Sequence, residues 1–136
     1  MEYNIRRREK KDCKDIARVV TVSWNETYKG IISDDILDNL YKNEEKRASD
    51  AFNNFDVNDN HQFVLEVNNK IVGFINVGKT DDENYLNCGE IFAIYIEEKY
   101  HNNGFGKKLI DVGIQELKEM GFDKMIIGCL KENSSN

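Results

Sequence analysis

Two glycines in the run Gly104-Phe105-Gly106 open a predicted helix, and this stretch is the one best suited to chemistry. The first N–H groups of a helix lack intrahelical partners and carry partial positive charge, so they can bind an anion. Glycine lets a phosphate approach the backbone because it has no Cβ. Lys107 and Lys108 fall in the first turn, where the helix dipole disfavours cations unless an anion is bound. The pattern predicts a phosphate site, while a plain helix start with two glycines remains the simpler interpretation.

The loop differs from the two common nucleotide-binding motifs. A Walker loop places Ser or Thr after its lysine, but here Lys107 is followed by Lys108. A Rossmann loop has a third glycine where this chain has Leu109. We therefore expect neither motif, and an unrelated phosphate-binding α/β domain stays open as one alternative.

The pattern of apolar residues predicts the elements that position this loop. Strands are expected at residues 3–8, 63–67, 70–78, 86–96 and 124–130. Helices are expected from residue 12 to about 30, after Ser33, over residues 44–55, and over residues 104–120. Asp12 is expected to cap the first helix, with Asp15 completing part of a capping box. Ile71, Ile75 and Val77 alternate and are expected on one face of their strand.

The order of these elements predicts the fold class. A strand, two or three helices, an antiparallel meander and a final β-α-β unit form one α/β domain over residues 1–136. The expected sheet is mixed and mostly antiparallel, with helices on both faces. Its last two strands are parallel through a right-handed crossover.

Composition and charge exclude several classes of protein. Of 136 residues, 40% are hydrophobic and 32% charged, which is typical of a globular chain. No apolar run reaches the ~18 residues of a membrane span, and the charged N-terminus leads into no secretory signal. A net charge of −6 argues against nucleic acid or an anionic membrane as partner. Cys13, Cys88 and Cys129 lack metal-site spacing, so we expect no metal and reduced, buried thiols in a cytoplasmic protein.

The loop and its flanking elements resemble the GNAT superfamily of acetyl-CoA-dependent N-acetyltransferases. The family signature is Gln/Arg-x-x-Gly-x-Gly/Ala after an apolar strand, and this chain reads His101-Asn102-Asn103-Gly104-Phe105-Gly106. His101 departs from the usual Gln or Arg. The front half also resembles small bacterial members, with Trp24 followed by Tyr28-Lys29-Gly30. The resemblance covers essentially the whole chain, is specific over residues 90–133, and implies a GNAT-like sheet.

The resemblance implies that acetyl-CoA lies beside the strand at residues 91–96. Backbone groups of Ile94, Tyr95 and Ile96 would hold the pantetheine arm, and one amide would polarise the thioester oxygen. Asn133 matches a family Asn that often touches this arm. The expected coenzyme-binding residues of the loop are His101, Asn102, Asn103, Gly104, Phe105, Gly106, Lys107 and Lys108.

The resemblance also offers candidates for catalysis and acceptor binding. Glu90 lies fourteen residues before Gly104, the offset of the catalytic Glu in histone-type members, and could act as general base. A solvent-exposed Glu at a strand edge is the alternative. Trp24 and Tyr28 would wall the acceptor pocket, although core packing is the stronger interpretation for Trp24. His61 is expected to be a plain surface residue.

We therefore expect an N-acetyltransferase that moves an acetyl group from acetyl-CoA to a primary amine of a small molecule or peptide, by direct attack in a ternary complex. The family continues past Asn133 into a helix, often with a Tyr acid, and two further strands, whereas this sequence ends at Asn136. Truncation, a partner that supplies the missing elements, or lost catalysis would account for this. The alternative function is thus an inactive CoA-binding or dimerisation module. An exposed strand edge at residues 124–130 would favour a homodimer.

Overall fold

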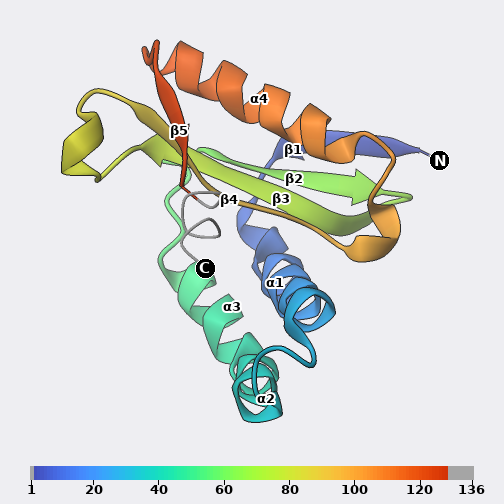
Figure 1. The fold of residues 1–136 in the computed structure, drawn as a ribbon. Coiled ribbons are helices and arrows are strands. Elements are labelled where there is room, and N and C mark those ends of the chain that lie inside the picture. The colour runs from blue at the N-terminus through green and yellow to red at the C-terminus, as the bar shows by residue number, and fades with distance from the viewer. Residues whose placement is uncertain (1, 129–136) are drawn as a thin grey trace.

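A computed structural model describes residues 2–128 as a five-stranded sheet flanked by helices (Figure 1). The strands lie in the order β1-β2-β3-β4-β5, with bounds Tyr3–Arg7, Gln62–Val67, Lys70–Lys79, Gly89–Ile96 and Met125–Ile127. The first four are antiparallel neighbours, whereas β4 and β5 are parallel. The predicted mixed, mostly antiparallel sheet with two parallel final strands is confirmed.

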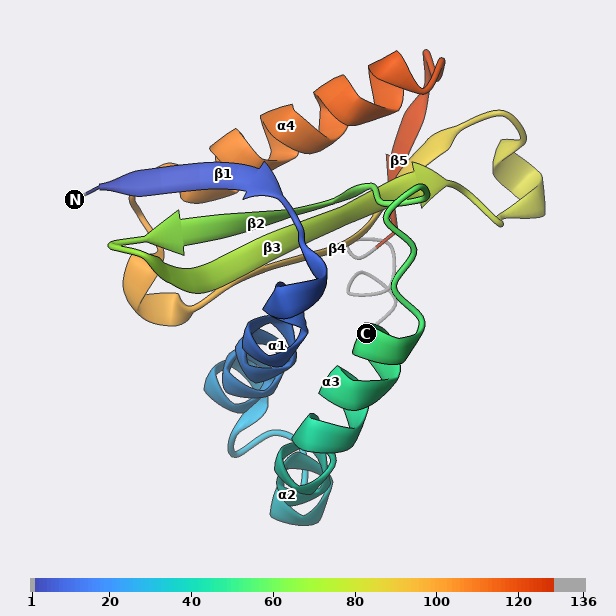
Figure 2. The same cartoon turned by 180° about the vertical axis from the view of Figure 1, so that it is seen from behind.

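Helices cover both faces of the sheet, as predicted. Their bounds are Cys13–Tyr28 for α1, Asp34–Lys42 for α2, Glu44–Asn53 for α3 and Phe105–Glu119 for α4. Short 3-10 turns form η1 (Lys10–Asp12), η2 (Glu83–Tyr85) and η3 (Glu98–Tyr100). Helix α4 lies on one face, whereas α1 and α3 lie on the other and α2 extends away from the sheet (Figures 1 and 2). No helix within residues 2–128 has the length and apolar character needed to cross a bilayer.

Each face of the sheet has its own core. On the α4 side, Phe105, Leu109 and Leu117 of the helix pack onto buried strand residues that include Leu65, Ile75, Val77 and Ile91. On the α1 side, Val19 packs with Val64, Ile71 and Phe74. The two cores fix the orientation of β4, with Ile91, Ile94 and Ile96 on the α4 side and Ala93 and Tyr95 on the α1 side. The alternation is interrupted at Phe92, where the register with β3 shifts.

A bulge in β3 changes the predicted side of Ile71. Leu65 of β2 pairs with Gly73, but the next residue, Glu66, pairs with Ile71, so β3 has one extra residue at this point. An extra residue reverses the alternation of a strand. Ile71 therefore joins the α1-side core, whereas Ile75 and Val77 pack toward α4. The expectation that all three share one face is wrong for Ile71.

The start of α1 also differs from its prediction. Asp12 occupies the N-cap position, but its side chain makes no capping bond to α1. Its carboxylate instead accepts hydrogen bonds from the Arg6 guanidinium and from the N–H of Glu9, because the chain turns one step earlier as η1. Burial raises the pKa of Asp12, but the hydrogen bonds from Arg6 outweigh this and leave it below its ordinary value.

Strand β4 begins later than the apolar pattern predicts. Residues 83–85 form η2 and Asn87 has a φ of +67°, so pairing starts at Gly89. Cys88 accordingly precedes the strand instead of lying in it, although it is buried as expected. Within the described residues β5 covers Met125–Ile127. Cys129 and Asn133 lie outside the described residues.

Candidate active site

Within residues 2–128, the edge of β4 that faces β5 is paired over less than half of its length. In this part of the chain, β5 pairs with Gly89, Glu90 and Ile91 through Met125, Ile126 and Ile127. Strand β3, on the other side, pairs with β4 as far as Ile96. Residues 92–96 therefore have no strand partner on the β5 side among residues 2–128. We call this stretch the open edge of β4.

The alternation of backbone groups shows which residues face the open edge. The N–H of Glu97 donates to the carbonyl of Val72 in β3. Successive residues of a strand direct their N–H and C=O groups to opposite sides. Ile96 and Ile94 thus direct theirs to the open edge, whereas Tyr95 directs its backbone groups to β3. Of the three predicted pantetheine contacts, Ile94 and Ile96 have backbone groups on the open edge.

The loop that follows β4 folds the chain back into α4 through two left-handed residues. Asn102 has a φ of +66°, and Gly104, the N-cap of α4, has a φ of +77°. Asn and Gly are the residues that adopt this conformation most readily. The side-chain amide of Asn103 donates to the carbonyls of Tyr100 and His101 and so ties the loop together. The loop is therefore built to hold a particular backbone shape.

The loop presents free amides to solvent. The backbone N–H groups of residues 102–107 donate to no acceptor within residues 2–128, whereas the N–H of Lys108 bonds to the carbonyl of Gly104. A cavity of about 310 Å³ opens beside these amides and is lined by Ile94, Ile96, Tyr100, His101, Asn102, Gly104, Phe105 and Gly106. A Cβ built on Gly104 would meet nothing within 4 Å. The space in front of the helix N-terminus is thus open.

The two lysines of the first turn contact different elements, Lys107 the surface of α4 and Lys108 the first residue of β1. Lys107 pairs with Asp111 one turn further on, and the Lys108 ammonium lies 5.4 Å from the centre of the Tyr3 ring. Both side chains of the Lys107–Asp111 salt bridge are exposed to solvent, so this salt bridge contributes little to stability. A phosphate contact for these side chains remains a prediction.

His101 closes the end of the open edge. Its Nε2 lies 2.8 Å from the carbonyl oxygen of Ile96. The ring is exposed and lines the cavity together with the free amides. It is the residue at which this chain differs from the Gln or Arg of the signature.

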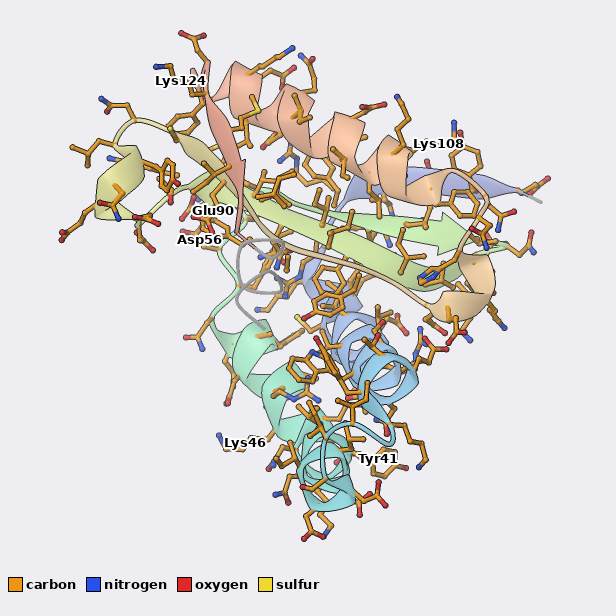
Figure 3. All side chains as sticks on the ribbon, viewed as in Figure 1. Tyr41, Lys46, Asp56, Glu90, Lys108 and Lys124 are labelled. Atoms are coloured by element: carbon orange, nitrogen blue, oxygen red, sulfur yellow. The ribbon has the colours of Figure 1, made fainter. Side chains whose placement is uncertain are left out.

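Glu90 lies toward the β5 end of the sheet, away from Lys108 (Figure 3). A Cβ on Gly89 would meet Leu117 of α4, so the next residue, Glu90, faces the side of α1 and α3. Its Oε1 accepts a hydrogen bond from the Thr80 hydroxyl, and its Oε2 occupies the space where a Cβ of Gly128 would stand. Glu90 is half-buried, which does not match the alternative of a free, solvent-exposed side chain.

Trp24 and Tyr28 pack against the same face of the sheet as Glu90. Their rings lie 4.8 Å apart, and the Trp24 Nε1–H donates to the Tyr95 hydroxyl at 3.2 Å. Both residues are partly exposed, and Trp24 packs against the sheet without being fully buried. The aromatic cluster of Trp24, Tyr28 and Tyr95 thus forms a wall beside β4.

Two buried polar atoms near this wall have no partner within residues 2–128. They are the Ser23 Oγ of α1 and the Asn76 Oδ1 of β3. Asn76 pairs with Ala93, which packs on the α1 side, and directly paired residues share a face of the sheet. Buried polar groups normally find hydrogen-bond partners. This face therefore carries two unsatisfied polar atoms that lie beneath its surface.

Sequence reasoning missed a second set of charged residues. The Arg7 guanidinium donates two hydrogen bonds to Glu116 of α4, and His61 Nδ1 lies 2.7 Å from the same carboxylate. The prediction that His61 is a plain surface residue is wrong, because this contact partly buries it. The three residues are far apart in the chain, so spacing carries no signal for them. They lie away from the loop and tie β1 to α4.

A larger cavity of about 560 Å³ lies elsewhere, between η1, the start of α1, and α3. Its lining mixes lysines and glutamates with Cys13 and Phe52. None of its described lining residues belongs to a strand, so it does not adjoin an open strand edge. We therefore centre the site on the smaller cavity beside Gly104.

Comparison with known proteins identifies the family of the chain. Residues 22–136 match the model of the acetyltransferase (GNAT) family. The chain is 32% identical over 133 residues to the uncharacterized N-acetyltransferase YuaI of Bacillus subtilis (strain 168), a match that covers 96% of this chain and 73% of that protein.

Solved structures share the fold. The PaiA N-acetyltransferase of Thermoplasma acidophilum, in complex with coenzyme A, has a TM-score of 0.67 and 21% identity, over 90% of this chain and 76% of that one. A GNAT family acetyltransferase of Brucella melitensis, in complex with acetyl-CoA, has a TM-score of 0.61 and 15% identity, over 93% and 75% of the two chains.

Proposed function

Since the chain belongs to the GNAT acetyltransferase family, we propose that it transfers an acetyl group from acetyl-CoA to a primary amine of a small molecule or peptide. The amine would attack the thioester directly while both substrates are bound. The observation that carries this proposal is the row of free amides at residues 102–107 beside the open edge of β4.

The loop residues fit the coenzyme pyrophosphate. Free N–H groups at the start of a 15-residue helix favour an anion through direct hydrogen bonds and the helix dipole. Gly104 and Gly106 leave the approach clear, because a Cβ at Gly106 would meet only Ile96 Cδ1, at 3.8 Å. The residues that would hold the pyrophosphate are the predicted Asn102, Asn103, Gly104, Gly106 and Lys107.

The open edge fits the pantetheine arm. An extended chain with amide groups can pair with the backbone of Ile94 and with the N–H of Ile96, whose carbonyl contacts His101, as a neighbouring strand would. The N–H of one of these residues would then act as a preorganised donor to the thioester oxygen, where negative charge develops during attack. When bound, the coenzyme supplies the activated acetyl group.

The amine acceptor would approach along the α1 side of β4. The wall of Trp24, Tyr28 and Tyr95 provides apolar surface for it. Glu90 on the same face would take the proton from the ammonium, directly or through water, so that the neutral amine attacks. These roles rest on the placement of the side chains and on the family resemblance.

Thermal unfolding in the presence of acetyl-CoA tests the coenzyme assignment. A ligand that binds only the folded state raises the melting temperature, by an amount that grows with its concentration. We expect acetyl-CoA to do so for the wild type and for Gly106→Ala, because Ala occurs at this position of the signature. Gly106→Asp puts a carboxylate in the path of the phosphates, so its shift should vanish.

Turnover is tested separately by thiol release with a panel of polyamines, amino acids and peptides. Amine-dependent release of CoA supports the proposed transfer. If the coenzyme binds but no amine in the panel causes release of CoA, the alternative, an inactive CoA-binding module, is supported. Equal thermal shifts for Gly106→Ala and Gly106→Asp would contradict binding at this loop.

A further inference from the structure

We infer that the ring of Phe92 selects the acceptor, and that the acceptor is a primary amine with an apolar body and no carboxylate. The inference rests on the proposed function and names the class of amine that the same site would take. It starts from a large apolar side chain that β4 leaves in contact with solvent. Phe92 is 40% exposed, although it lies in the middle of the strand.

An irregularity in the pairing of β3 with β4 frees Phe92 from the alternation of its strand. Asn76 pairs with Ala93, but the next residue of β3, Val77, pairs with Ile91. Phe92 is therefore the extra residue of a bulge, and a bulge changes the direction of a side chain relative to a regular strand. The direction of the Phe92 ring thus follows from the register of the two strands.

The ring lies on the α1 side of the sheet, next to Glu90. A Cβ built on Gly78 would be 2.9 Å from Phe92 Cε2, so the ring covers this glycine. Gly78 follows Val77, which packs on the α4 side, and therefore faces the α1 side. Gly78 also pairs directly with Glu90, and directly paired residues are neighbours on one face. Phe92 thus occupies the place beside Glu90 that a side chain at residue 78 would take.

Phe92 lies between the proposed base and the part of β4 that would hold the thioester. Glu90 is two residues before it, and Ile94, whose backbone groups are on the open edge, is two residues after it. An amine that gives its proton to Glu90 and attacks a thioester beside Ile94 brings its carbon skeleton against the Phe92 ring. In this step the C–N bond forms as the thioester C–S bond breaks, and the sulfur leaves with the electron pair.

The surroundings of Phe92 favour an ammonium. Within residues 2–128 the Glu90 carboxylate takes part in no salt bridge, and its hydrogen bond comes from the Thr80 hydroxyl. The face of an aromatic ring attracts a cation. In the described part of the chain, no lysine or arginine lies over Phe92 or over the aromatic wall beside β4. A carboxylate and aromatic rings therefore remain for a cationic acceptor to contact.

The same surroundings disfavour an acceptor that carries a carboxylate. Two arginines reach into the α1 side, but both are engaged. Arg18 pairs with Glu97, and Arg47 donates to the Thr21 hydroxyl and to the Leu40 carbonyl. A carboxylate next to Phe92 would lose water near Glu90 without gaining a cation, and an unpaired charge is costly to desolvate. The site should therefore reject α-amino acids.

Phenethylamine and L-phenylalanine test the selectivity, because they share the amine and the ring and differ by one carboxylate. We expect kcat/KM for acetylation to be roughly a hundredfold higher for phenethylamine. L-Phenylalaninol has a neutral hydroxymethyl group in place of the carboxylate, so it controls for size and should resemble phenethylamine. Equal kcat/KM for phenethylamine and L-phenylalanine would overturn the inference while leaving the proposed acetyl transfer intact.

Two substitutions test the ring itself. Phe92→Ala removes it, and Gly78→Ala displaces it, because a Cβ there collides with Phe92 Cε2. Both should raise the KM for phenethylamine roughly tenfold and leave the thermal shift caused by acetyl-CoA unchanged. Phe52→Ala, at a partly exposed ring of α3 that lines the other cavity, is the matched control and should keep the wild-type KM. An unchanged KM in both Phe92→Ala and Gly78→Ala would overturn the role of Phe92.

Acceptor binding can also be measured without turnover, through the emission of Trp24, the single Trp of the chain. With CoA present, phenethylamine should change the emission of the wild type saturably, and Phe92→Ala should bind it roughly tenfold more weakly. This result without any acetylation would contradict the proposed transfer but support the acceptor class. An absence of both saturable binding and acetylation would overturn both proposals.

Discussion

The Thr80 hydroxyl donates a hydrogen bond to Oε1 of Glu90, with the two oxygens 2.5 Å apart. The same hydroxyl accepts from the N–H of Asp82, so its proton is directed to the carboxylate. Oε2 fits beside residue 128 only because that residue is Gly and has no Cβ. Thr80 and Gly128 together hold the Glu90 carboxylate in one orientation on the α1 side of β4.

Thr80 is therefore predicted to position Glu90 for catalysis. Thr80→Val keeps the shape of the side chain but removes the donor, and we expect kcat of amine acetylation to fall roughly tenfold, the cost of a hydrogen bond to a charged group. Thr80→Ser should restore most of kcat, and the KM for acetyl-CoA should stay unchanged in both. Glu90→Gln should lower kcat by roughly a hundredfold or more. A wild-type rate in Glu90→Gln would show that this carboxylate is not the base.

The contact between Trp24 and Tyr95 can be followed by fluorescence, because Trp24 is the single Trp of the chain. Tyr95→Phe removes the acceptor of the Trp24 Nε1–H and should shift the emission maximum of the protein. The contact is partly exposed, so the free energy of unfolding should fall by less than about 1 kcal/mol. Tyr41→Phe, on an exposed ring of α2, is the control and should change neither quantity. Unchanged emission in Tyr95→Phe would contradict the contact.

The Arg7–Glu116 pair predicts a loss of stability in acid. Hydrogen bonds from Arg7 lower the pKa of Glu116 from 4.5 to about 2, with a smaller contribution from His61. A carboxyl whose pKa is lower in the folded protein stabilises it fully above the unfolded value. That stabilisation disappears as the pH falls from about 4.5 toward 2.

Urea unfolding of Glu116→Gln measures this contribution. Because Arg7 is 47% exposed and screened by solvent, we expect a loss of about 1–2 kcal/mol at neutral pH instead of the full shift. The difference from wild type should shrink as the solution is acidified. Glu119→Gln, on the exposed surface of the same helix, should cost much less, because Glu119 acts on Arg7 only through a charge interaction and not through a hydrogen bond. A constant difference at all pH values would contradict the assigned cause.

Gly113 is predicted to be required by packing between α4 and β3. A Cβ there would lie 2.8 Å from Ile75 Cδ1 and 3.0 Å from Val77 Cγ1. Gly113→Ala gains helix propensity but overpacks the core, and we expect a net loss of about 1 kcal/mol in unfolding free energy. Gly106→Ala, in open space on the same helix, should be neutral or slightly stabilising. If the two substitutions change the unfolding free energy equally, the core accommodates the extra methyl group at residue 113 without loss of stability.

Local patterns in the sequence were enough to predict the order of the elements and the location of the loop. The apolar strand before Gly104 and the glycines at the helix start are patterns of residues close together in the sequence. Such patterns can be recognised in a single sequence. The layered sheet followed from the order of elements alone. The orientation of Ile71 could not be read in this way, because the β3 bulge depends on pairing with β2.

Contacts between distant residues were the part of the candidate site that could not be predicted. Thr80 lies in a polar loop and gives no sign of its bond to Glu90, which depends on the path of the chain between β3 and β4. Arg7 and Glu116 are likewise 109 residues apart in the sequence, so their pairing could not be predicted from local patterns. The open edge at Ile94 and Ile96 depends on how far β5 pairs with β4 within residues 2–128.

The place of β1 at the edge of the sheet bears on the order in which the chain assembles. Strands β2, β3 and β4 are consecutive antiparallel neighbours, so their contacts close short loops. Strand β1 pairs with β2 across the whole helical region, as in the contact of Arg6 with Glu66, 60 residues away. Long loops are slower and entropically more costly to close. The meander should therefore form first, and the N-terminal strand should dock last and detach first when the protein begins to unfold.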